Sequence, residues 1–121
     1  MSLIGSTNEE KIWNYLKAKG LPDCGIAGLM GNLYAESSLI PTNLQNSYEK
    51  ALSFTDAAYT AAVDNGTYQN FVKDSAGYGL AQWTYWSRKK SLLDFAKKRG
   101  KSIGDLEMQL DFLWNELQGY T

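Results

Sequence analysis

The sequence contains no histidine, and this absence removes several hydrolytic chemistries in one step. Ser-His-Asp and Cys-His hydrolases need an imidazole base, and HExxH zinc enzymes bind their metal through two histidines. Carboxylic acids are therefore the best remaining groups for acid–base chemistry. We expect neither a metal site nor a cofactor.

Cysteine is almost absent as well. Cys24 is the single cysteine, so no internal disulfide can form. A thiol without a histidine partner is also a poor nucleophile. We expect Cys24 to be a small, buried packing residue.

The sequence also has no large net charge of either sign and no long apolar run. The net charge is −1 and the isoelectric point is near 5.3, which provides no basic field for nucleic acid or an anionic membrane. No apolar run approaches the roughly 20 residues that span a bilayer, and the N-terminus lacks the pattern of a signal peptide. We expect no nucleic-acid partner and no membrane partner, and the export route stays unknown.

The composition is otherwise that of a folded domain. The chain has 121 residues, of which 44% are hydrophobic and 13% aromatic, enough for one core. We expect a single domain over residues 1–121. Residues 1–6 are expected to be disordered or a remnant of expression.

Two helices are predicted in the first third of the chain. Thr7 and Glu10 form a capping-box pattern, and apolar residues at helical spacing follow until Gly20. Pro22 opens a second helix over residues 23–36, which is apolar on nearly all sides. We expect this second helix to be central and buried.

Three glycines of the second helix share one face. Gly25, Gly28 and Gly31 follow each other at steps of three residues. Each costs about 1 kcal/mol against alanine in a helix interior. We therefore expect that another backbone approaches this face closely.

The rest of the chain predicts further helices. Residues 41–50 are interpreted as a loop with one turn at most. Thr55 can cap a helix over 56–64, although the Asn65-Gly66 pair also permits a short β-ribbon over 63–72. A helix capped by Thr84 or Ser87 runs to residue 99, with Trp86 among its candidate buried residues, and a last helix covers 105–118. The fold class is mainly α, with about five helices and at most a small β element.

Two motifs carry a family resemblance. The first is the glycine-spaced segment over residues 25–38, which ends in Glu36 and Ser37, and the second is the run GYGLAQWT that begins at Gly77. Together they resemble the lysozyme superfamily, on the side of goose-type lysozymes and lytic transglycosylases, and more narrowly the phage tail-tip lysozyme family. The resemblance implies a lysozyme-like fold around the central helix and a peptidoglycan substrate.

Glu36 is the candidate general acid. Cleavage of a glycosidic bond requires a carboxylic acid that protonates the leaving oxygen, and partial burial favours the protonated form. Glu36 is the acidic residue whose apolar neighbours in sequence, such as Leu33 and Leu39, offer such burial. The alternative is a helix-end carboxylate that is solvated or paired with a cation.

The second catalytic group is less defined. In chicken-type lysozymes the residue before the Tyr-Gly pair is an aspartate, but this chain has Gly77 there. Asp74 is the nearest substitute and is our candidate base, and an exposed loop aspartate that caps a turn is the equal alternative. Asp56 and Asp64 are explained by helix-terminal or turn roles. Glu36 alone is a further alternative, as in lytic transglycosylases, where the substrate's own 6-hydroxyl attacks.

The resemblance also implies substrate-binding residues. These are Ser37, Tyr78, Gly79, Gln82 and Trp83. Aromatic rings pack on the C–H faces of sugars, and polar groups beside them bind hydroxyl and N-acetyl groups. Core packing is the alternative for each aromatic residue. Ser37 is expected to bond locally, either to backbone at the helix end or to Glu36.

The sequence thus predicts a peptidoglycan glycosidase that cleaves the β-1,4 bond between N-acetylmuramic acid and N-acetylglucosamine. The resemblance implies a tail-associated or prophage-derived protein that acts on glycan strands of the cell wall. Because free wall lysins gain from positive charge, the mild acidity of the chain favours delivery by attachment to other tail or wall-hydrolase domains. The rival from another class is a non-catalytic glycan-binding or structural tail module with the same fold. A helical interaction domain unrelated to sugars is the third reading.

Overall fold

The computed structural model describes residues 3–118, and its regular structure over that range is helical. It contains the six helices α1 (Asn8–Ala18), α2 (Asp23–Ser37), α3 (Asn46–Leu52), α4 (Asp56–Asn65), α5 (Trp86–Arg99) and α6 (Leu106–Leu117). Within the described residues there is no strand, only two isolated bridges that pair Tyr78 with Leu44 and with Trp83. The prediction of a mainly α chain is confirmed, and the β-ribbon over 63–72 does not form.

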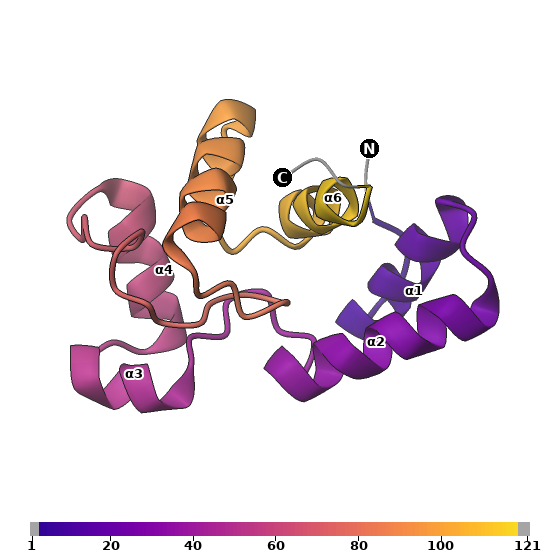
Figure 1. The fold of residues 1–121 in the computed structure, drawn as a ribbon, viewed down its shortest axis with the longest axis horizontal. Coiled ribbons are helices and arrows are strands. Elements are labelled where there is room, and N and C mark those ends of the chain that lie inside the picture. Colours follow the sequence, from indigo (N-terminus) through magenta and orange to yellow (C-terminus); the bar gives the residue numbers. More distant parts are fainter. Residues whose placement is uncertain (1–2, 119–121) are drawn as a thin grey trace.

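The helices form two groups around a central loop (Figure 1). Helix α1 packs against α2, and α5 packs against α6. Helices α3 and α4 lie with α5 at one end of the molecule, away from α1 and α2. The segment between α4 and α5 runs through the middle, toward the C-terminal end of α2. The C-terminal end of the first motif and the second motif therefore meet in this central region.

Most helix ends follow the capping signals. Thr7 accepts a hydrogen bond from the Glu10 amide, and Thr55 and Asp105 cap α4 and α6 in the same way. The Glu10 carboxylate accepts from the Ser6 amide at 2.8 Å, so the capping box closes one residue earlier than expected. Helices α4 and α5 end at Gly66 and Gly100, both in the left-handed conformation.

Three local expectations need correction. Helix α3 forms where a loop was expected; it buries none of its residues, so its sequence carries no apolar period. Helix α5 is capped by Tyr85, without a side-chain bond, rather than by Thr84 or Ser87. Residues 3–6 contact α1, because the Ile4 carbonyl accepts from Asn14, whereas residues 1 and 2 lie outside the described range.

Helix α2 is buried on one side only, which corrects the expectation of a central buried helix. Its buried face consists of Ile26, Met30, Leu33 and Ser37. The glycine face is exposed, and a Cβ added at Gly28 or Gly31 would meet no atom within 4 Å. No backbone approaches these glycines closely. Cys24 is exposed as well, not buried.

Candidate active site

The two motifs are joined by Ser37. Its hydroxyl is buried and lies 2.8 Å from the Leu80 carbonyl oxygen and 3.0 Å from the Leu33 carbonyl oxygen. The first contact bridges the end of α2 to the GYGLAQWT loop, and the second is a bond back to the preceding turn of the helix. Ser37 therefore binds backbone, as one sequence alternative held, and its buried hydroxyl is not available to a glycan.

Glu36 lies at the last turn of α2, one residue before this link. Its side chain is exposed, which corrects the expectation that neighbouring apolar residues bury it. The apolar side of the helix end is occupied by Leu33 and Ser37, and Glu36 projects from the flank. The carboxyl is accessible to a large ligand, and any desolvation of it has to come from that ligand.

The loop that follows is held from inside by α6. Gln109 is fully buried, and its side-chain oxygen accepts from the Leu80 amide at 2.9 Å. Its amide nitrogen donates to the carbonyl oxygens of Pro41 and Ile103, each at 2.7 Å. A Cβ at Gly79 would lie 2.9 Å from the Gln109 oxygen, and Gly79 has a φ of +83°. Gly79 thus makes a close internal contact, not the contact with substrate that was expected.

Tyr78 and Trp83 belong to the core, which corrects their assignment to a cleft wall. Both side chains are completely buried. The Tyr78 hydroxyl pairs with Thr60 at 2.5 Å, and the Trp83 indole nitrogen donates to Glu116 at 2.9 Å. Burial raises the pKa of Tyr78 above its ordinary value. Both aromatic side chains therefore pack in the core, which was the alternative expected for them.

Gln82, unlike Tyr78 and Trp83 of the same loop, stays partly exposed. Its amide nitrogen donates to the Asn43 and Gly79 carbonyl oxygens at 2.8 and 3.1 Å, and its φ is 49°. A Cβ at Gly77 would lie 2.8 Å from the Gln82 side-chain oxygen and 3.1 Å from that of Gln45. A side chain at this position, which is aspartate in chicken-type lysozymes, would therefore require the Gln82 and Gln45 side chains to shift.

Asp74 is fully engaged by other groups. Its carboxylate is 2% exposed and accepts from the Lys89 ammonium at 2.5 Å, the Tyr59 hydroxyl at 2.6 Å, the Tyr68 hydroxyl at 2.8 Å and the Ala76 amide at 2.9 Å. A base that holds a water needs a free lone pair directed at the substrate. The structure thus places Asp74 in neither expected position, an open cleft or an exposed turn, and its contacts favour a structural role.

Lys89 is the counter-ion that sequence reasoning missed. It is completely buried, and besides Asp74 it donates to the Ala76 carbonyl at 2.7 Å and lies 4.3 Å from the Phe71 ring centroid. Burial lowers the pKa of the Lys89 ammonium, and the Asp74 carboxylate opposes that shift. Lys89 stands at helical spacing with Leu92 and Ala96, and a lysine on a buried face signals a buried partner.

Asp56 and Asp64 lie near the two ends of α4 and bind distant groups, rather than the local helix-terminal or turn groups that were expected. Asp56 accepts from the Leu44 amide at 3.0 Å. Asp64 accepts from the Ile103 amide at 2.9 Å and from the Ser102 hydroxyl at 2.5 Å. Over residues 3–118 the structure contains no group of three or more side chains suited to hold a metal ion, and no helix in that range is long and apolar enough to cross a membrane.

One known protein family matches the chain over most of its length. A family model described as phage tail lysozyme matches residues 7–121. The chain belongs to the phage tail lysozyme family. No curated protein and no solved structure matches it. Membership confirms the resemblance of the two motifs and the lysozyme-like, mainly α fold, and it supports a peptidoglycan-related function and an association with phage tails.

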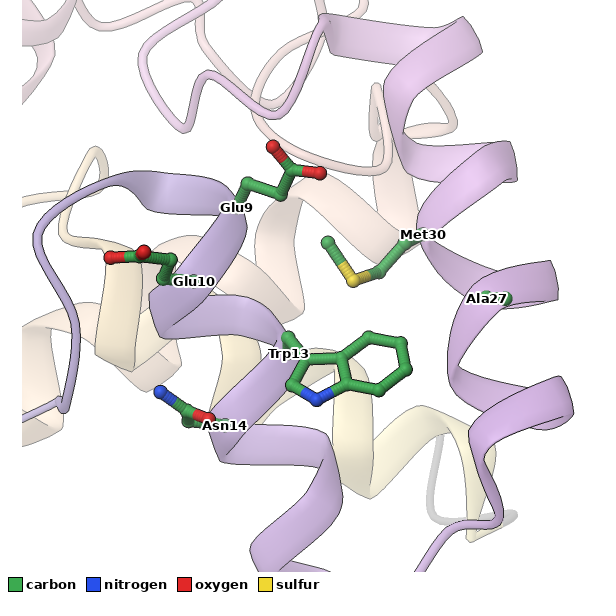
Figure 2. Close-up of a pocket in the computed structure, with 6 residues that line it drawn as sticks. All are labelled: Glu9, Glu10, Trp13, Asn14, Ala27 and Met30. Atoms are coloured by element: carbon green, nitrogen blue, oxygen red, sulfur yellow. The ribbon is translucent and has the colours of Figure 1, made fainter.

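One pocket of this family member is lined by two residues of the first motif, Ala27 and Met30, but by none of the GYGLAQWT loop. It has a volume of about 810 Å³ and lies between α1 and α2, lined by Glu9, Glu10, Trp13, Asn14, Ala27 and Met30. Figure 2 shows the Trp13 ring and the Met30 side chain in the gap between the two helices, with Glu10 directed away from α2. Glu36 is not among the lining residues, so we place the candidate site at the Ser37–Leu80 junction instead.

Proposed function

We propose that the protein is a peptidoglycan glycosidase that cleaves the β-1,4 bond between N-acetylmuramic acid and N-acetylglucosamine, with Glu36 as the general acid. The observation that carries the proposal is the Ser37 bridge, which fixes the turn that bears Glu36 against the GYGLAQWT loop at 2.8 Å. Family membership over residues 7–121 supports the substrate class.

The acid step uses the accessible carboxyl of Glu36. It donates a proton to the glycosidic oxygen while the bond from that oxygen to the anomeric carbon breaks, and positive charge develops on the sugar ring. The glycan strand covers the carboxyl when it binds, because Glu36 is exposed in the free protein. The bound strand then excludes water from the carboxyl.

The attacking group is best supplied by the substrate. Asp74 is occupied by four donors, and Gly77 offers no side chain, so the loop presents no free carboxylate at either position. In this route the 6-hydroxyl of the muramic acid attacks its own anomeric carbon and passes its proton to the Glu36 carboxylate. The acid is regenerated, no water is consumed, and the product carries a 1,6-anhydro end. Glu36 would then act alone, as in lytic transglycosylases.

The setting that fits this activity is a phage tail or a prophage-derived wall-degrading protein. The near-neutral charge of −1 supports delivery by attachment to other tail or wall-hydrolase domains, since free wall lysins gain from positive charge. The glycan strands of the cell wall are the proposed partner.

Digestion of purified peptidoglycan, followed by mass spectrometry of the soluble products, tests the proposal. Anhydro-muramic ends support the substrate-assisted route, and reducing muramic ends indicate attack by water. Reducing N-acetylglucosamine ends would show that the other glycosidic bond is cleaved. Absence of any soluble product, with the glycan still bound, would make the protein a non-catalytic tail module.

A further inference from the structure

Two large aromatic side chains remain exposed directly after the motif loop. Tyr85 is 63% exposed and Trp86 is 54% exposed, and their ring centroids lie 6.2 Å apart. The planes are inclined at 39°, so the rings form one tilted aromatic surface. The sequence predicted Trp86 to be buried, and the structure corrects this. Contiguous exposed apolar surface of this kind often marks a binding site.

The pair is mounted on a rigid base. Glu116 of α6 accepts from the Trp83 indole at 2.9 Å and forms two hydrogen bonds to Arg88 at 2.7 and 2.9 Å. Trp83 precedes Tyr85 by two residues, and Arg88 follows Trp86 by two residues. One carboxylate thus binds a side chain on each side of the pair, and the hydrogen bond to Glu116 raises the pKa of Arg88. A fixed surface loses little conformational freedom when it binds.

The aromatic pair also follows directly on the accessible end of the motif loop in the chain. Trp83 turns inward, but Gln82 is partly exposed and Thr84, Tyr85 and Trp86 are exposed. Tyr85 caps α5 without a side-chain hydrogen bond, so the first amides of α5 point at the same edge as free donors. Apolar ring faces beside hydrogen-bond donors are the combination that recognises a sugar with acetamido and hydroxyl groups.

We propose that Tyr85 and Trp86 form a binding platform for an N-acetylated sugar of the glycan strand, adjoining the Glu36 site. This inference rests on the proposed function, because that function supplies the glycan. The ring faces pack on the C–H face of the sugar, and the amides at the start of α5 donate hydrogen bonds to its acetamido or carboxylate oxygens. The platform sets affinity and register of the strand, while Glu36 performs the chemistry.

Binding is measured on the Glu36→Gln background, which separates it from cleavage. The ligand is the hexamer of β-1,4-linked N-acetylglucosamine, followed by intrinsic tryptophan fluorescence and by calorimetry. Trp86 is exposed, whereas Trp83 is buried and Trp13 and Trp114 are partly buried, so the fluorescence change is expected to come from Trp86. Trp86→Ala should raise the dissociation constant roughly 5- to 10-fold and remove the fluorescence change. Trp86→Phe should recover part of the affinity.

Tyr34→Ala is the matched control. Tyr34 is 64% exposed, much like Tyr85, but it lies on α2. Residues two apart on a helix are separated by about 200°, so Tyr34 and Glu36 project from different sides of α2. The control should bind the hexamer like the parent. A dissociation constant unchanged in both Trp86→Ala and Tyr85→Ala would overturn the platform.

Failure of the platform and failure of the proposed function give different results. If the protein with Glu36 intact cleaves peptidoglycan and Trp86→Ala leaves its KM unchanged, the platform is wrong and the glycosidase stands. If the Glu36→Gln protein binds the hexamer through Trp86 while the protein with Glu36 intact releases no product, the platform stands and the glycosidase is wrong. Binding of a protein partner at Tyr85 and Trp86, with no affinity for the hexamer, would also overturn the platform.

Discussion

The Ser37 hydroxyl lies 2.8 Å from the carbonyl oxygen of Leu80, 43 residues further along the chain. This contact joins the helix end that carries Glu36 to the loop that carries the second motif. Both groups are buried, so water cannot replace the bond if it is lost. The C-terminal end of α2 and the GYGLAQWT loop therefore form one structural unit.

Ser37→Ala should lower the free energy of unfolding by about 1 to 2 kcal/mol, because the buried Leu80 carbonyl loses its donor. Ser91→Ala, at an exposed position of α5, is the control and should stay within about 0.5 kcal/mol. Urea denaturation followed by circular dichroism provides the comparison. Equal midpoints for the two variants would contradict the role given to Ser37.

Gly77→Asp should not create the missing nucleophile of chicken-type lysozymes. The new Cβ would meet side-chain oxygens at 2.8 and 3.1 Å, and overpacking of this kind costs about 1 to 3 kcal/mol. Both stability and peptidoglycan cleavage should fall. A stable Gly77→Asp protein with increased activity would refute this account of the loop.

Gly28→Ala, in contrast to Gly77→Asp, adds a side chain where there is space for one. Gly28 lies on the exposed face of α2, and an added Cβ would meet no atom within 4 Å. The substitution should stabilise the protein by up to about 1 kcal/mol through helix propensity alone. A loss of stability in thermal denaturation would mean that another segment packs on this face in solution.

Asp74→Asn should destabilise the protein by about 3 to 5 kcal/mol, because it leaves the buried Lys89 without its counter-ion. Combining it with Lys89→Met should recover part of that loss. Activity should follow the folded fraction at each temperature. An Asp74→Asn protein that keeps wild-type stability but loses roughly 100-fold in activity would restore Asp74 as the base.

The sequence predicted the helices that carry their own signals. α1, α4 and α6 have a capping side chain followed by apolar residues at helical spacing, and their bounds are close to prediction. α3 was missed because it buries no residue and has no apolar period. α2 misled because its apolar composition was interpreted as burial on all sides, whereas tertiary packing covers one side only.

The candidate site was predicted in outline but not in its contacts. The two motifs predicted the family and identified Glu36 as the candidate general acid. A sequence motif does not reveal, however, which of its side chains face the protein core. Tyr78 and Trp83 are buried, and the exposed aromatic pair comes just after the motif. The partners of Asp74 come from α4, α5 and the 66–76 segment, and such long-range contacts leave no local pattern.

Alkaline pH should unfold the protein through its tyrosines. Burial is the largest cause that raises the pKa of Tyr15, Tyr59, Tyr68 and Tyr78 above the ordinary value of 10.0. A raised folded-state pKa gives stability that is complete below pH 10 and is lost as the pH rises toward the folded values. The lowered pKa of Lys89 has the opposite effect, because the cost of burying its charge decreases as the pH rises toward 10.5. This single group is outweighed by the four tyrosines.

Absorbance of tyrosinate and helical circular dichroism, followed together in one titration, test this expectation. The four tyrosines should ionise only as the helical signal disappears. Ionisation of all eight tyrosines of the chain with the helical signal intact would contradict the burial described for them.

The most direct test of the central claim compares the protein with its Glu36→Gln variant on purified peptidoglycan. An amide keeps the shape of the side chain but cannot donate the required proton. Because Glu36 is exposed, the variant should fold and bind glycan like the parent. The account predicts release of soluble muropeptides by the parent and essentially none by the variant. Appreciable release by a cleanly purified Glu36→Gln protein would contradict it.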